Sequence, residues 1–125
     1  MEQHVSSDLF PPGFPSELAS AAFVHSKETA WRPSLAATSI KWFAAHGYAV
    51  LGTELWLPKH GSIQSLPYFQ NVDRKGGETW DAFVARAAIQ TSGYFSEFSR
   101  NLVEEGDVYV HVNWVSEAEF EKLYL

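Results

Sequence analysis

Hydrophobic and polar residues alternate along residues 48–57, whose sequence YAVLGTELWL is typical of a β-strand. One face of this strand would carry Ala49, Leu51, Thr53, Leu55 and Leu57. The other face would carry Val50, Gly52, Glu54 and Trp56. The β-branched segment VYVHVNWV at 108–115 predicts a second strand, and YFQNVD at 68–73 predicts a shorter strand that returns antiparallel to the first.

Apolar residues with helical spacing predict four helices. The longest begins at Glu78 or Thr79 and runs to about residue 101, with apolar positions that follow the i, i+3, i+4, i+7 pattern. A short helix is expected over residues 17–25 after an N-cap at Ser16. A third is expected over residues 34–46, with Pro33 in its first turn and Gly47 at its end. Ser116 and Glu119 have capping-box spacing for a helix at the end of the chain.

This order of elements predicts an α+β fold with a small, mostly antiparallel sheet of about three strands packed with about four helices. A chain of 125 residues fits a single domain, residues 1–125. Residues 1–15 are expected to be an irregular lead-in, because LFPPGFPS is too rich in proline and glycine for a helix or a central strand.

The charge balance restricts the class of partner. Fifteen acidic residues against nine Lys and Arg give a formal charge of −6, which argues against nucleic acid and suits a protein partner with a basic surface. The chain has no cysteine, and we expect neither a signal peptide nor a membrane span. These features are compatible with a cytoplasmic protein that does not bind a membrane.

The sequence carries no recognisable motif for catalysis or for a cofactor. Its five histidines form no H-x-x-x-H or H-x-H pair, and there is no G-x-S-x-G, P-loop or G-x-G-x-x-G motif. We therefore expect no metal and no cofactor. The segment RKGGE has cations and glycines suited to an anion at a helix N-terminus, but a plain turn between strand and helix is the favoured interpretation.

The strongest candidate site lies on one face of the predicted sheet. If residues 48–57 pair with residues 108–115, one face would bring together Glu54, Trp56, Tyr109, His111 and Asn113. Three interpretations of Glu54 and His111 remain open: a structural hydrogen bond across the sheet, a polar patch that recognises a partner, and an acid–base catalytic pair. The exposed tryptophan and tyrosine side chains of such a patch would favour protein binding.

Residues 34–120 resemble the small immunity proteins of bacterial polymorphic toxin systems, and the nearest group is immunity protein 40. The resemblance is carried by the order WFAAHGYAVLGTELWL, GGETWDAFVARA and DVYVHVNWVSEAEF. Its most distinctive residues are Gly52, Glu54, Trp56, Glu78, Trp80 and Arg86.

The resemblance implies a non-enzymatic protein that binds and neutralises a cognate toxin domain. Two alternatives stay open. One is a small enzyme or ligand-binding domain that uses a pocket around Glu54 and His111. The other is a regulatory subunit that binds a different protein. The sequence leaves the oligomeric state undetermined.

Overall fold

The structure of the protein, a computed structural model, describes residues 9–59, 62–102 and 108–124. These residues form a single α+β domain with four helices and a five-stranded sheet. The elements in chain order are α1 (Ser16–Ala21), β1 (Phe23–His25), β2 (Glu28–Trp31), α2 (Pro33–Ala45), β3 (Ala49–Lys59), β4 (Ser62–Asn71), α3 (Trp80–Leu102), β5 (Tyr109–Val115) and α4 (Glu117–Tyr124).

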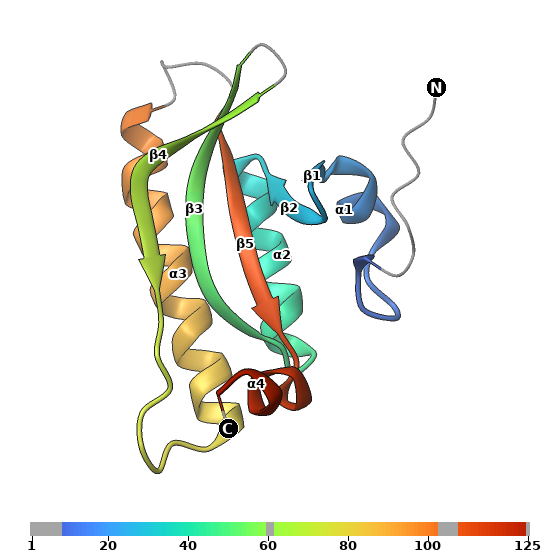
Figure 1. The fold of residues 1–125 in the computed structure, drawn as a ribbon, viewed down its shortest axis with the longest axis vertical. Coiled ribbons are helices and arrows are strands. Elements are labelled where there is room, and N and C mark those ends of the chain that lie inside the picture. The colour runs from blue at the N-terminus through green and yellow to red at the C-terminus, as the bar shows by residue number, and fades with distance from the viewer. Residues whose placement is uncertain (1–8, 60–61, 103–107, 125) are drawn as a thin grey trace.

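The sheet has the strand order β1-β2-β5-β3-β4, and all neighbouring strands are antiparallel. Strands β3, β4 and β5 form a curved layer in front of α2 and α3, while α4 closes the lower end (Figure 1). The hairpin of β1 and β2 extends the sheet beside β5. One face of the sheet is therefore covered by helices, and the opposite face remains open.

Two hydrophobic clusters hold the helices on the sheet. In the first, Ile40 and Phe43 of α2 pack on Leu55 and Val110 of the central strands, and none of these side chains is more than 1% exposed. The second gathers Ala49, Leu51, Val72, Trp80, Phe83, Val84, Ala87 and Val115, with Phe120 packed against it. The first cluster therefore anchors α2 on the central strands, and the second anchors the first half of α3 on them.

The α+β class and the four helices were predicted correctly, but the sheet has five strands and not about three, because the segment after Ala21 is a hairpin and not the end of a helix. Ala22 has an extended ψ of 137°, which ends α1 before the predicted residue 25. A two-residue turn then joins β1 to β2, with Ser26 at φ 50° and Lys27 at φ 67°. The hairpin forms because β2 pairs with β5 and brings Trp31, which is fully buried, into the first cluster.

The predicted alternation along the first strand was also wrong at its start. The pairing of β3 with β5 shifts register between Val50 and Gly52, as in a β-bulge. Val50 is therefore buried in the cluster of Leu55 and not on the face of Glu54, while Leu51 belongs to the second cluster. The returning strand β4 is longer than predicted, because it begins at Ser62.

The local signals at both ends of α2 and at the start of α4 were correct, whereas the predicted N-cap at Ser16 was wrong: Ser16 is the first residue of α1, and its N-cap residue is Pro15. Pro33 is the first residue of α2, and Gly47 has the left-handed φ of 83° that follows its end. The backbone N–H of Glu119 donates to Ser116 Oγ at 3.1 Å, and the N–H of Ser116 donates to Glu119 Oε1 at 2.8 Å. This reciprocal pair is the predicted capping box of α4.

The N-terminal lead-in contributes to the core. Residues 1–8 lie outside the described part of the chain, and residues 9–15 contain neither α-helix nor strand. Phe10 and Phe14 stack with ring centroids 4.6 Å apart, and both rings contact Trp31. None of the described helices is long and apolar enough to cross a membrane.

Candidate functional site

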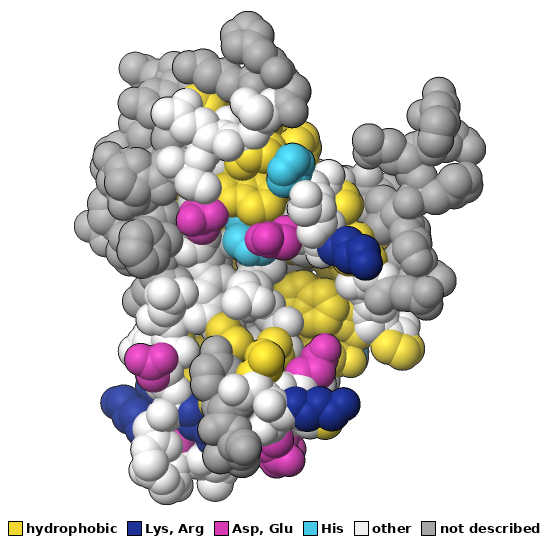
Figure 2. All heavy atoms as spheres, in the orientation of Figure 1, with side chains coloured by type: hydrophobic (Ala, Val, Ile, Leu, Met, Phe, Trp, Pro, Cys, Tyr) yellow, Lys and Arg dark blue, Asp and Glu magenta, His cyan; other side chains and the backbone are white. Residues whose placement is uncertain are grey.

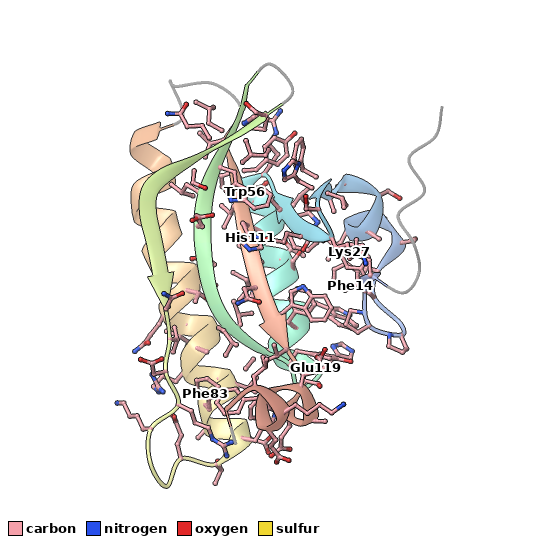
Figure 3. The ribbon with its side chains drawn as sticks, in the orientation of Figure 1. Phe14, Lys27, Trp56, Phe83, His111 and Glu119 are labelled. Carbon is pink, nitrogen blue, oxygen red and sulfur yellow. The ribbon has the colours of Figure 1, made fainter. Side chains whose placement is uncertain are left out.

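The open face of the sheet carries all five residues that the sequence singled out. In the register of β3 and β5, Glu54 lies opposite His111 and Trp56 lies opposite Tyr109, while Asn113 lies opposite Gly52. Figure 3 shows Trp56 and His111 next to each other on neighbouring strands. Acidic and histidine side chains surround a hydrophobic surface on the upper part of this face (Figure 2).

Trp56 forms the centre of the upper part of this face without being exposed itself. Its side chain is 4% exposed and stacks on the ring of His111, with centroids 4.6 Å apart and planes 11° apart. The ring of His25 meets it edge-on at 6.3 Å. Trp56 is therefore packed into the sheet face and is not the exposed aromatic side chain that the sequence suggested.

The indole of Trp56 fixes the carboxylate of Glu54. Trp56 Nε1 donates to Glu54 Oε1 at 2.6 Å, and Ser65 Oγ donates to the same oxygen at 3.3 Å. Among the described residues no donor contacts Glu54 Oε2, and no Lys or Arg pairs with this carboxylate. Glu54 therefore presents one oriented carboxylate oxygen at a half-buried position of the open face.

His111 links β5 to the β1–β2 hairpin. Its Nδ1 lies 2.9 Å from the carbonyl oxygen of Thr29, and its Nε2 lies 3.0 Å from Glu28 Oε2. A carbonyl and a carboxylate both accept, so both contacts are hydrogen bonds only when both ring nitrogens carry a proton. The imidazole is therefore occupied on both edges by the hairpin.

Glu54 and His111 are neighbours but do not form the hydrogen bond that one interpretation of the sequence expected. The carboxylate beside the imidazole belongs to Glu28. The sequence did not indicate Glu28, because its strand β2 follows the helix predicted over residues 17–25 and was assigned to no element. The only available signal was its position between two short β-branched or aromatic segments, VH and TAW.

Tyr109 and Asn113 lie at opposite ends of the face. The ring of Tyr109 packs against Phe23 at 5.2 Å, and the guanidinium of Arg32 lies 5.1 Å from its centroid, a cation–π contact. Asn113 is exposed, and no described residue hydrogen bonds its side chain. The two residues therefore differ in availability: Tyr109 is packed, and Asn113 is open to a ligand.

An open pocket of about 930 Å³ begins at Asn113. Its walls come from β3, β4, β5, the loop that leads into α3, and Phe120 of α4. The lining residues are Leu51, Asn71, Val72, Asp73, Arg74, Lys75, Gly76, Gly77, Glu78, Thr79, Asn113 and Phe120. The volume falls in the range of small-molecule and peptide pockets in proteins.

The loop that walls this pocket is held by Glu78 and Arg86. Arg86 Nε donates to Glu78 Oε2 at 2.8 Å, and Arg86 Nη2 donates to Glu78 Oε1 at 2.8 Å. Arg86 also donates to the carbonyl oxygen of Asp73 at 2.7 Å, and the backbone N–H of Lys75 donates to Glu78 Oε1 at 3.0 Å. Hydrogen bonds from Arg86 and from the Lys75 backbone lower the pKa of Glu78 from its ordinary value of 4.5 to about 2.

Arg74 completes this loop. Its Nε and Nη2 both donate to the carbonyl oxygen of Glu78, at 3.2 and 3.0 Å. Its guanidinium lies over the rings of Trp80 and Phe120 at 5.5 and 5.8 Å. The segment is the predicted turn between strand and helix, and hydrogen bonds from Arg74 and Arg86 hold it in place.

No group of three or more His, Cys, Asp and Glu in the described residues has the arrangement of a metal site. Comparisons of the chain with protein-family models, with curated proteins and with solved structures found no match.

Proposed function

We propose that this protein is a non-enzymatic immunity protein of a bacterial polymorphic toxin system, similar to immunity protein 40, that acts in the cytoplasm. In this proposal it binds a cognate toxin domain through the open face of its sheet and blocks the toxin's activity. The observation that carries the proposal is the carboxylate of Glu54, which Trp56 orients on this face with one oxygen unpaired among the described residues. Such a group suits recognition of a lysine or arginine of a partner.

Charge on the whole chain supports a protein partner with a basic surface. The formal charge of −6 would accelerate encounter with a cationic toxin, while the fixed carboxylate would contribute to specificity. A standard interface covers ~800 Å² on each partner. That is a small part of the 7692 Å² accessible surface, so one face of this domain is large enough.

The contacts of His111 favour binding over catalysis by a Glu54–His111 pair. A general base needs a nitrogen free to take a proton from the substrate. Both nitrogens of His111 are directed at acceptors in the hairpin, and its ring face is covered by Trp56. Glu54 in turn is bonded to Trp56 and Ser65, so the two side chains do not act on a common atom.

The experiment that tests the proposal is a rescue assay with the gene immediately upstream in the source genome. The upstream product is expressed alone and together with this protein, and growth is recorded with complex formation on a sizing column. Relief of toxicity together with a stable complex is the expected result. If the upstream product is toxic, and this protein neither relieves the toxicity nor binds the product, the proposal is contradicted for that partner.

A charge variant makes the assay specific to the proposed face. Glu54→Lys reverses the oriented carboxylate and is expected to abolish rescue. Glu121→Lys makes the same change at an exposed position of α4 and is expected to leave rescue intact. Equal rescue by both variants would show that the toxin does not bind at Glu54.

A further inference from the structure

The pocket beside Asn113 has a hydrogen-bonding pattern that matches a polypeptide backbone. Asn71 of β4 and Asn113 of β5 both lie opposite Gly52 of the strand between them. Both asparagines are exposed and line the pocket, and no described residue bonds either carboxamide. Gly52 is buried and has no side chain, so no side chain of β3 stands between these two positions.

Each carboxamide presents one carbonyl acceptor and one NH₂ donor group. That pairing is complementary to the N–H and C=O of a peptide unit. Asn71 and Asn113 lie two strands apart, which places their Cα atoms ~10 Å from one another. An extended chain advances ~3.3 Å per residue, so the two carboxamides are spaced for peptide units about three residues apart.

The remaining walls indicate which side chains such a segment would carry. Leu51 and Phe120 supply an apolar surface at the end of the pocket near α4. Lys75 is exposed at the rim, and no described carboxylate pairs with its ammonium group.

Among the described residues, no carboxylate of the pocket forms an ion pair with Lys75. The Glu78 carboxylate is already bonded by Arg86, and Arg74 is bonded to the Glu78 carbonyl. Asp73 is the second acid of the lining and opposes Lys75 and Arg74. The four charged residues of the lining, Asp73, Arg74, Lys75 and Glu78, sum to zero, so an acidic residue of the bound segment would be recognised by the Lys75 ammonium group itself and not by a net positive rim.

We infer that this pocket binds an extended peptide segment of a partner protein, with Asn71 and Asn113 pairing its backbone and Lys75 pairing an acidic side chain. That the segment belongs to the toxin rests on the proposed function. The segment would cross the strands of the sheet, beside the carboxylate of Glu54. The open face then offers a cation-binding group and a peptide-binding pocket side by side, which would fix the orientation of the partner.

The inference is tested with a display library that mixes random linear peptides with peptides tiled across the upstream gene product. The library is selected on the wild-type protein, and the affinity of enriched peptides is then measured for two variants. Asn71→Ala/Asn113→Ala removes both carboxamides, and Gln64→Ala removes an exposed carboxamide of β4 outside the pocket. Loss of two to four hydrogen bonds is expected to weaken binding by about 10- to 100-fold in the double variant only.

Enriched peptides that bind the double variant as tightly as wild type would overturn the inference, and so would a selection that enriches nothing. Nuclear magnetic resonance titrations with inorganic phosphate and with acetate form a second arm. Shifts at Lys75 with either anion, without any selected peptide, would assign an anion site in place of a peptide site. If selected random peptides bind only when both carboxamides are present, but the rescue assay fails, the peptide pocket is supported and the immunity proposal is rejected. If the rescue assay succeeds but no selected peptide depends on the carboxamides, the immunity proposal is supported and the peptide pocket is rejected.

Discussion

Glu78 and Arg86 form a two-point ion pair that joins the loop before α3 to the second turn of that helix. Both N–O distances are 2.8 Å, and the side chains are 13% and 22% exposed. Arg86 also bonds the Asp73 carbonyl, so one guanidinium spans the whole loop that walls the pocket. The shape of the pocket therefore depends on this pair.

This ion pair predicts a specific pH dependence of stability. The pKa of Glu78 is lowered to about 2 in the folded protein, chiefly by the hydrogen bonds from Arg86. A lowered folded-state pKa stabilises the fold at pH values above the ordinary value of 4.5, and this stabilisation is lost as the pH falls toward about 2. Wild type should therefore melt above Glu78→Gln at neutral pH, and the two melting temperatures should converge in acid.

Melting is followed by circular dichroism from neutral pH down to the lowest pH at which both proteins fold. Other carboxylates titrate in both proteins, so the difference between the two curves isolates Glu78. Arg86→Met removes the main cause of the pKa shift of Glu78. The difference in melting temperature between wild type and Arg86→Met should therefore also shrink as the pH falls. A constant gap between wild type and Glu78→Gln at every pH would contradict the assignment.

Trp80 is expected to be the most sensitive side chain at the start of α3. It is 9% exposed, contacts the rings of Phe83 and Phe120, and donates from Nε1 to the Gly47 carbonyl at 2.8 Å. Trp80→Ala should lower the free energy of unfolding by about 3–5 kcal/mol because it removes a buried ring. Trp80→Phe keeps a ring but loses the hydrogen bond, and should cost about 1–2 kcal/mol.

Urea denaturation of both variants gives the two free energies of unfolding. A Trp80→Ala variant with the urea midpoint of wild type would mean that the ring does not stabilise the second cluster. If Trp80→Phe cost as much as Trp80→Ala, the hydrogen bond to Gly47 would be the main contribution of this residue.

The elements that were predicted correctly have local signals at their ends. Pro33 and Gly47 bound α2, and Ser116 with Glu119 caps α4, so each boundary depends on a few adjacent residues. The β1–β2 hairpin has no such signal. A two-residue turn with positive φ at both positions favours Asn-Gly, and here it is Ser26-Lys27. The strand pairing of β2 with β5, which is distant in the sequence, determines this hairpin.

The same distinction applies to the candidate site. The two-residue period of strands was sufficient to place Glu54 and His111 on one face, but the register that sets them opposite each other is given by the pairing of β3 with β5. The true partner of His111 was not predictable, since Glu28 reaches it only through the unpredicted hairpin. The pocket was missed because the positions of Asn71 and Asn113 around Gly52 depend on the register on both sides of β3.

The capping box of α4 gives a prediction with a close control. Ser116→Ala removes the acceptor for the Glu119 N–H and should destabilise the protein by about 1 kcal/mol. Glu119→Gln keeps an oxygen that can accept from the Ser116 N–H, so it should cost less. The two urea midpoints test this order. A larger loss for Glu119→Gln would show that the charge of Glu119, and not the capping geometry, stabilises α4.

Glu54 gives the prediction that separates binding from folding. Its carboxylate is half-buried and accepts from Trp56 and Ser65, while its second oxygen has no partner among the described residues. If that oxygen binds a cation of the toxin, Glu54→Ala should remove a charged hydrogen bond and weaken toxin binding by about 10- to 150-fold. Glu54→Ala also removes the acceptor of the buried Trp56 Nε1, so it should lower the free energy of unfolding by about 0.5–1.5 kcal/mol, less than the loss expected in binding.

Calorimetric titration of the toxin domain measures the affinity, and the matched control is Glu121→Ala, which removes the same charge from an exposed site on α4. Trp56→Phe adds a second test, because it keeps a ring against His111 but releases Glu54 Oε1. We expect it to weaken binding less than Glu54→Ala, since the carboxylate remains but is no longer held in place. An unchanged affinity of Glu54→Ala together with a large loss of melting temperature would assign this carboxylate to the stability of the sheet.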